Sequence, residues 1–173
     1  HLENLPPAAR RLRQAFGFHG HDDDQVLRAR AAYYGLITYL DDKIGRLLDT
    51  LEEQGLAENT VVIHTSDHGE SLGEHGLWRK MNFYEQAARV PLQISWPGVI
   101  PGGQRIPGAV SLVDVTATIL DMAGASPDPG RLFEADGDSL LPMLRGETEA
   151  WKDEAFVEHL AHGTDRARAM IRR

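Results

Sequence analysis

The sequence predicts an α/β fold, in which helices flank a sheet of short strands. Three observations support this prediction. Apolar residues recur at helical spacing over residues 25 to 54, a short β-branched segment, NTVVIHTS, follows at residues 59 to 66, and a second helical pattern, SLVDVTATILDMAG, occupies residues 111 to 124. Helical segments that alternate with short apolar strands are typical of α/β proteins.

The longest predicted element is an amphipathic helix over residues 25 to 54. Asp24 is the expected N-cap, because a short acidic side chain can accept hydrogen bonds from the first free backbone amides. Gly55 is expected to end the helix, because glycine readily adopts the left-handed conformation that follows a C-cap. The apolar positions recur mostly at intervals of three and four and therefore share one face: Val26, Tyr33, Ile37, Leu40, Ile44, Leu47, Leu48 and Leu51.

The segments around this helix have shorter patterns. NTVVIHTS is expected to be a buried strand of a parallel sheet, because it is β-branched and bounded by turn residues. NFYEQAAR is compatible with a short helix, VPLQISWP with a second strand, and PGVIPGGQRIPG with a hairpin. Residues 1 to 24 are predicted to be loop and connector, apart from a short helical turn at AARRLRQAF.

The last third of the chain is predicted to contain a helix over residues 111 to 124, with Ser111 as its N-cap and Gly124 as its stop. A short helix is expected at SLLPML and a late strand at DEAFVEHL. Both chain ends resemble cut ends: HLENLPPAARR has neither an initiator methionine nor the apolar core of a signal peptide, and DRARAMIRR has no terminating turn. We therefore expect the chain to be a segment of a longer protein.

Composition excludes several classes of function. The formal net charge is −8, and the basic residues are scattered except at the C-terminus, which argues against a nucleic-acid partner. The chain has no cysteine, so it has no disulfide, thiolate metal site or cysteine nucleophile, and a reducing or cytoplasmic setting is permitted without being required. No apolar run approaches the roughly 18 residues needed to span a membrane. The oligomeric state is left open.

Charged and polar residues follow the predicted strand at once, in the stretch SDHGE. Strand ends in open α/β sheets are common ligand sites, and Gly69 permits the turn that would let Asp67 and His68 face one ion. A carboxylate beside an imidazole is a common pair of divalent-metal ligands. The dipeptide alone is equally compatible with Asp67 as a cap of the following turn and His68 as a hydrogen-bonded loop residue.

Lys80 lies thirteen positions after Asp67, beyond a loop that contains glycine and could fold back over the same edge. Its ammonium would suit an oxyanion such as sulfate or phosphate, and the alternative is a solvated loop lysine. Glu70, Glu74 and His75 are expected to form the loop or to support the metal ligands, instead of binding the metal directly.

The stretch TSDHGESLGEHGLWRKMNFYEQAARVPL resembles the metal-ligand and lysine motif of type I sulfatases in the alkaline phosphatase superfamily, most closely the choline sulfatase and arylsulfatase branch. YYGLITYLDDKIGRLLDTLEEQGL, SLVDVTATILDMAG and DGDSLLPMLRG agree with the resemblance, in the family's order, over residues 25 to 146. It implies the C-terminal part of an alkaline-phosphatase-like mixed sheet flanked by helices, with the N-terminal half missing. Residues 1 to 24 would be a connector, and residues 147 to 173 the truncated start of a C-terminal subdomain.

The resemblance also implies roles for individual residues. Asp67 and His68 would be the late pair of metal ligands, for Ca²⁺ in most members and with Mn²⁺ or Mg²⁺ as alternatives. Many members have asparagine in place of His68, which leaves the metal less defined. Lys80 would be the catalytic and substrate-binding lysine that contacts the sulfate and neutralises its charge. Arg89 is expected to be structural, with Glu85 as a candidate partner.

The family's nucleophile is a formylglycine made from the first residue of a C/S-x-P-x-R motif, and this motif is absent from the chain. A look-alike at residues 127 to 131 has proline where the nucleophile should stand. The formylglycine is therefore expected only in a missing upstream part. By itself, the chain is expected to be inactive and to expose a sheet face and edge, which favours aggregation.

Several functions remain open at this point. The first is a sulfuric ester hydrolase that acts on choline sulfate, an aryl sulfate or a sulfated sugar. The second is a phosphonate monoester or phosphodiester hydrolase of the same superfamily, and the third is a non-catalytic module whose Asp67 and His68 bind a structural ion or nothing. A serine hydrolase built from Ser66, Asp67 and His64 or His68 is disfavoured, because neighbours on a strand cannot easily form a nucleophile, base and orienting acid in line.

Overall fold

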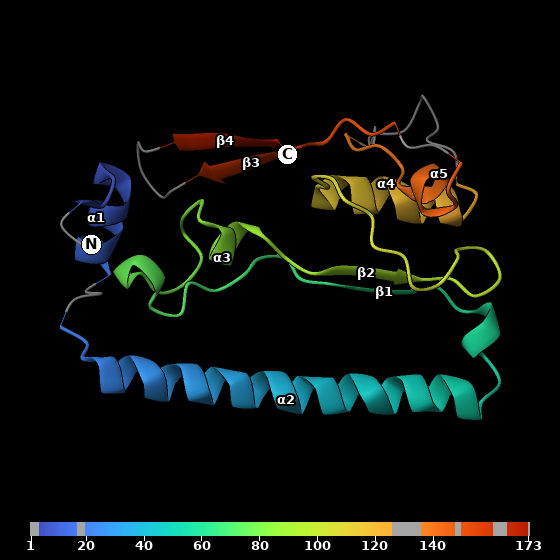
Figure 1. Cartoon of the computed structure of the whole chain (residues 1–173), viewed down its shortest axis with the longest axis horizontal. Coiled ribbons are helices and arrows are strands. Elements are labelled where there is room, and N and C mark those ends of the chain that lie inside the picture. The colour runs from blue at the N-terminus through green and yellow to red at the C-terminus, as the bar shows by residue number, and fades with distance from the viewer. Residues whose placement is uncertain (1–3, 17–19, 126–135, 148–149, 161–165, 173) are drawn as a thin grey trace. The chain divides into compact units, whose positions relative to one another are not determined.

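The computed structural model describes residues 4 to 16, 20 to 125, 136 to 147, 150 to 160 and 166 to 172. The chain forms two compact units, His1–Ile94 and Ser95–Arg173. The chain contains both helices and strands (Figure 1), which confirms the predicted mixture of helix and sheet.

Helix α2, Asp23–Glu53, is the longest element of the first unit. Its N-cap is Asp22, not the predicted Asp24. The Asp22 carboxylate accepts a hydrogen bond from the Gln25 amide at 2.7 Å, and the Gln25 side chain accepts one from the Asp22 amide at 3.0 Å. This reciprocal pair is a capping box, so the position of Gln25 determines which acid caps the helix. The predicted stop is confirmed, since Gly55 follows the C-cap with a φ of +68°.

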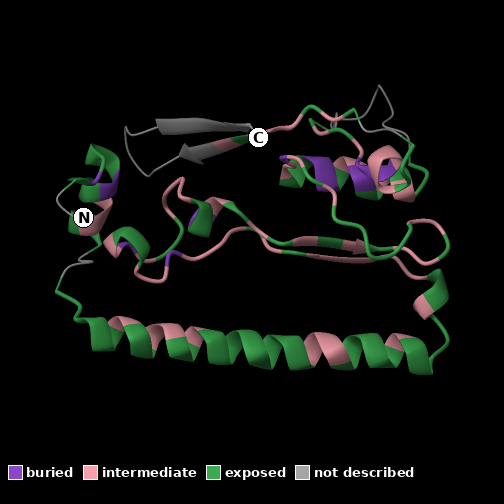
Figure 2. Cartoon of the chain, in the orientation of Figure 1, coloured by how far each residue is buried: buried purple, intermediate pink, exposed green. Residues whose placement is uncertain are grey.

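The apolar face of α2 is largely uncovered in the described part of the chain (Figure 2). None of its residues is buried, and Leu36 and Leu47 are 66% and 61% exposed. An amphipathic helix normally buries such a stripe against other elements. Within this face, Val26, Tyr33, Ile44 and Leu51 are half-buried.

Helix α1, Pro7–Ala15, occupies part of the region predicted as connector. The expected helical turn is a nine-residue helix that begins with proline, a favourable first residue because the amide it lacks would have no partner there. Leu5 and Ala9 form a small core with Leu77, whose exposed fraction is 1%, and Leu12 and Tyr84 pack against it. The core of the first unit thus joins α1 to the loop that follows the first strand.

Strands β1, Val62–Thr65, and β2, Leu92–Ser95, form a two-stranded sheet. They are antiparallel: the end of β1 lies at the beginning of β2, where Thr65 Oγ1 donates a hydrogen bond to the Pro91 carbonyl at 2.8 Å. The expected parallel arrangement is wrong for this pair, because the chain returns through the short helix α3, Glu85–Ala88, without a helical crossover. β1 is also less buried than predicted, with residues 62 to 64 half-buried and Thr65 exposed.

The second unit contains helices α4, Leu112–Met122, and α5, Leu141–Leu144. Ser111 and Gly124 bound α4 as predicted. Strand β3, Glu154–Leu160, is the predicted late strand, and it pairs in antiparallel register with β4, Arg166–Arg172, which was not predicted. The candidate hairpin between residues 97 and 108, all of which the structure describes, contains turns and no strand.

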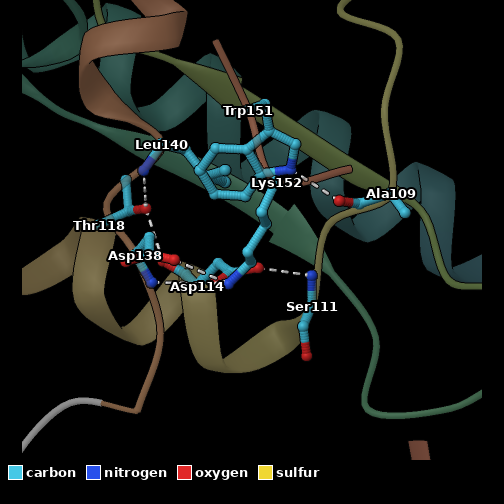
Figure 3. A network of polar contacts seen from close by, with 8 residues as sticks. All are labelled: Ala109, Ser111, Asp114, Thr118, Asp138, Leu140, Trp151 and Lys152. Atoms are coloured by element: carbon cyan, nitrogen blue, oxygen red, sulfur yellow. Dashed lines mark hydrogen bonds and ion pairs between the residues drawn. The ribbon is translucent and has the colours of Figure 1, made fainter. Parts of the chain in front are cut away.

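A network around Asp114 connects the parts of the second unit (Figure 3). The fully buried Asp114 carboxylate accepts hydrogen bonds from the amides of Ser111 and Asp138, at 2.8 and 3.0 Å, and from Lys152 Nζ at 2.7 Å. The hydrogen bond to Asp114 is the main cause that raises the pKa of Lys152 above its ordinary value, against the opposing effect of burial. Thr118 Oγ1 accepts from the Leu140 amide at 2.9 Å. The network therefore fixes α4 against the segments that precede α5 and β3.

Among the described residues, no helix combines the length and the apolar character that a membrane crossing requires.

Candidate functional site

Asp67 and His68 follow β1 directly, and their side chains face each other. Asp67 Oδ2 lies 3.3 Å from His68 Nε2, and Asp67 Oδ1 accepts a hydrogen bond from the His68 amide at 3.0 Å. The Asp67 side chain is 81% exposed and that of His68 37% exposed. The turn at the strand end thus brings the carboxylate and the imidazole to one accessible point.

The contact of His68 Nδ1 determines which ring nitrogen faces the ligand position beside Asp67. His68 Nδ1 lies 2.8 Å from the Gly69 carbonyl oxygen. A carbonyl can only accept, so Nδ1 carries a proton and Nε2 is the nitrogen that faces Asp67. A backbone carbonyl on the second nitrogen is the usual support for a histidine that binds a metal. The same backbone contact also suits a histidine with no ligand.

Lys80 returns to this point from the far side of the loop. Its Nζ lies against His68 Nε2, and because an ammonium has only donors, the imidazole lone pair is the acceptor. The loop folds Lys80 over the strand end, as its glycines suggested, and brings Asp67, His68 and Lys80 together. Their roles toward a metal and an anion remain predictions.

The loop between His68 and Lys80 is closed at a neck. The Ser71 amide donates to the Arg79 carbonyl at 3.0 Å, and Glu70 Oε1 accepts from the Arg79 amide. Asn82 Nδ2 donates to Ser71 Oγ at 2.9 Å, and Ser71 is 3% exposed. These contacts hold the two ends of the loop together, so Lys80 lies beside the strand end.

Two arginines from the helices hold the body of the loop. Arg13 Nε of α1 donates to the Gly76 carbonyl at 3.1 Å, and Arg30 Nε of α2 donates to the Leu72 carbonyl at 2.8 Å. Arg30 also pairs with Glu74 at 3.3 Å. The loop needs such support because Leu72 and two other residues that are not glycine, His75 and Arg79, have positive φ angles of 48°, 52° and 67°.

The expected supporting residues have loop contacts. Glu74 binds Arg30, and the His75 ring stacks on Tyr84 with centroids 4.0 Å apart. Arg89 pairs with Glu85 across one helical turn at 3.8 Å, as predicted. Both partners of that pair are more than half exposed, so it contributes little to stability.

Gly69 is required by a close approach of two backbone segments. A Cβ atom at this position would lie 2.0 Å from the Gln86 carbonyl oxygen. The Gly69 amide donates to the Ala87 carbonyl at 2.8 Å, which fixes the turn against α3. Any larger residue would displace the main chain next to His68.

These side chains fit as part of a metal site. Asp67 supplies a carboxylate and His68 an unprotonated nitrogen, which suit Ca²⁺ and Mn²⁺ respectively. The described residues hold no group of three or more histidines, cysteines, aspartates or glutamates that could bind a metal ion, whereas Ca²⁺ takes about six to eight oxygen ligands. Most ligands of such an ion must therefore come from other groups.

Comparison with known proteins identifies the family. The family model for sulfatases matches residues 4 to 125. The chain belongs to the sulfatase family. A choline-sulfatase from Rhizobium meliloti strain 1021 is 43% identical over 147 residues, which are 84% of this chain and 28% of the relative. An arylsulfatase from Clostridium perfringens is 39% identical over 136 residues, covering 76% of this chain and 27% of the relative.

Solved structures agree with this sulfatase assignment. A phosphonate monoester hydrolase from Silicibacter pomeroyi superposes with a TM-score of 0.73 at 33% identity, covering 91% of this chain and 28% of that protein. The predicted resemblance to the choline sulfatase and arylsulfatase branch, and the predicted partial alkaline-phosphatase-like fold, are thus confirmed. The chain spans less than a third of the length of these relatives.

Four residues that hold the loop between His68 and Lys80 in place were not predicted: Arg13, Arg30, Ser71 and Asn82. Their partners lie between 11 and 63 positions away in the sequence. Contacts between residues so far apart in the sequence cannot be predicted from a local pattern. The look-alike at residues 127 to 131 lies outside the described residues.

Proposed function

We propose that this chain supplies the late metal ligands and the sulfate-binding lysine of a metal-dependent sulfuric ester hydrolase. One observation carries the proposal: Asp67, His68 and Lys80 meet at the end of β1. The sulfatase family assignment gives this arrangement its chemical context.

Each residue has a separate role in the proposal. Asp67 and His68 hold a divalent cation, with Ca²⁺ as the proposed ion and Mn²⁺ or Mg²⁺ as alternatives. When bound, the cation supplies a positive charge that polarises the sulfate ester. Lys80 contacts a sulfate oxygen and stabilises negative charge there, because a fixed ammonium is more effective where water is excluded.

The proposal assigns the chain only part of an active site. The C/S-x-P-x-R motif is absent from the sequence, and the described residues provide few metal donors. We therefore expect no turnover by the 173 residues alone. Activity is expected of a protein that joins this chain to a segment with the motif.

Hydrolysis of phosphonate monoesters is the second candidate. The structure of the phosphonate monoester hydrolase cited above matches 91% of this chain at 33% identity. Sulfate and phosphonate monoesters are both anionic tetrahedral groups, so a lysine beside a cation can serve either.

An assay of the intact protein that contains this chain would separate the candidates. Choline sulfate, an aryl sulfate and an aryl phosphonate monoester would be compared by kcat/KM. Sulfate esters are expected to be preferred, and a preference for the phosphonate would support the second candidate. No hydrolysis of any of them, with the metal supplied, would contradict both.

A further inference from the structure

We propose that Glu70 is a positioning residue that places Lys80 on the anion by fixing the backbone bend at Arg79. This inference rests on the proposed role of Lys80 in binding sulfate. It assigns a distinct task to a carboxylate that lies three positions from Asp67 and could otherwise be taken for a further metal ligand.

The first observation is the contact of Glu70 with the main chain. Glu70 is half-buried, and its Oε1 accepts a hydrogen bond from the amide of Arg79, the residue immediately before Lys80. A carboxylate that accepts from a backbone amide makes one of the stronger hydrogen bonds in proteins. Glu70 therefore fixes the backbone conformation of Arg79, which sets the direction of the main chain at Lys80.

The second observation is the conformation that this contact supports. Arg79 has a φ of 67°, a left-handed conformation that is unfavourable for residues other than glycine. Its carbonyl accepts from the Ser71 amide at 3.0 Å, so both polar groups of residue 79 are held from the same side of the neck. Because the amide and the carbonyl of Arg79 are both hydrogen-bonded, the bend is held in place, and the Lys80 side chain points toward His68.

The third observation separates Glu70 from its neighbours. Glu74 lies in the same loop, but its carboxylate binds the side chain of Arg30 in α2. Asn82 Nδ2 reaches the neck through Ser71 Oγ, not through the backbone of Arg79. Of these three side chains, Glu70 is the one that contacts the backbone of Arg79, directly before Lys80.

Two conservative variants distinguish hydrogen bonding from charge. Glu70→Gln keeps the length and an acceptor oxygen but removes the charge, whereas Glu70→Asp keeps the charge and shortens the reach by one methylene. The affinity for inorganic sulfate would be measured by calorimetry on the intact, metal-loaded protein, together with KM and kcat for a sulfate ester. Glu74→Ala is the control, because it removes an equal charge from the same loop without touching the neck.

We expect Glu70→Asp to weaken sulfate binding and raise KM by about tenfold, because a small misplacement of a binding group has a large effect. Glu70→Gln and Glu74→Ala should stay within about threefold of the parent, since an amide oxygen still accepts from Arg79. The affinity for Ca²⁺ should change little in all three. If Gln weakens sulfate binding as much as Asp does, or if Asp has no effect, the positioning role is refuted.

A double variant tests whether Glu70 acts through Lys80. In the Lys80→Ala background, Glu70→Asp should weaken sulfate binding by less than about twofold, because coupled residues are not additive. A full tenfold further loss would overturn the proposal. If Lys80→Ala alone leaves sulfate binding intact, the proposed function of Lys80 is wrong and this inference fails with it, an outcome distinct from a failure of Glu70 alone.

Discussion

The ammonium of Lys80 lies against Nε2 of His68, which precedes it by twelve positions. The contact closes the loop whose neck joins Ser71 to Arg79 and Asn82. Because Asp67 Oδ2 is 3.3 Å from the same nitrogen, a carboxylate, an imidazole lone pair and an ammonium share one exposed point. A cation bound by Asp67 and His68 would require Lys80 Nζ to move off His68 Nε2, toward an anion bound beside the cation.

Replacement of His68 by alanine should weaken metal binding. The substitution removes the nitrogen donor and leaves Asp67 as the remaining ligand of this pair, so affinity for Mn²⁺ is expected to fall at least about tenfold, and affinity for Ca²⁺ less, because imidazole is the softer ligand. Calorimetric titration of the intact protein with each ion measures this. His75→Ala is the control, since that ring stacks on Tyr84 instead. Equal affinities in the parent and His68→Ala would contradict the ligand role.

Replacement of Lys80 by alanine should impair sulfate turnover and leave metal binding intact. Loss of the ammonium is expected to lower kcat/KM for a sulfate ester by about 10² to 10³, as for other groups that stabilise developing charge. Metal affinity should stay equal or rise slightly, because the ammonium no longer occupies the lone pair of His68. Steady-state kinetics and calorimetry measure the two effects. Lys43→Ala, on the exposed surface of α2, should change neither, and a loss of metal instead of turnover would assign Lys80 a structural role.

A methyl group at position 69 should destabilise the site. In Gly69→Ala the new Cβ would lie 2.0 Å from the Gln86 carbonyl oxygen, and overpacking of this kind typically costs about 1–3 kcal/mol. Urea unfolding followed by circular dichroism measures the free energy of unfolding.

Gly45→Ala provides the matched control for that substitution. It lies inside α2 with no atom within 4 Å of the added Cβ, and alanine is favoured over glycine in a helix by about 0.5–1 kcal/mol. The two substitutions should therefore have opposite signs. Equal effects would show that the approach of Gly69 to α3 is not a constraint.

The pair formed by Lys152 and Asp114 should stabilise the second unit in a pH-dependent way. The pKa of Lys152 is raised in the folded state above its ordinary value of 10.5, chiefly by the hydrogen bond to Asp114. Its contribution is thus complete below pH 10.5 and is lost as the pH rises through the folded pKa. Lys152→Met leaves a buried carboxylate without its cation, and is expected to cost about 1–3 kcal/mol, less than a fully buried pair would, because Lys152 is partly exposed.

Urea unfolding at pH 8 and at alkaline pH tests this pair. The difference in unfolding free energy between the parent and Lys152→Met should be constant below pH 10 and shrink above about pH 10.5. Asp138→Asn should have a small effect, because its side chain is 69% exposed. A difference that grows with pH would contradict the assigned direction of the shift.

Several elements could be predicted from local sequence patterns alone. The periodicity of α2 and α4, the stops at Gly55 and Gly124, and the β-branched core of β1 all depend on residues close in sequence. The N-cap of α2 was misplaced by two residues, because three successive acids could each serve and only the partner Gln25 decides among them. In strand β4, RARAMIR, arginines and apolar residues largely alternate, a period-two signal from which the strand could have been predicted.

The family and the residue types at the strand end could be predicted from the sequence, because the motif around Asp67, His68 and Lys80 is continuous in the chain. Three features appear first in the folded chain: these side chains meet, β2 returns antiparallel to β1, and Glu70, Arg13 and Arg30 hold the loop. The physical reason is that periodicity and backbone preference act over a few residues, whereas the contacts that close the loop join residues up to 63 positions apart and depend on the path of the whole chain.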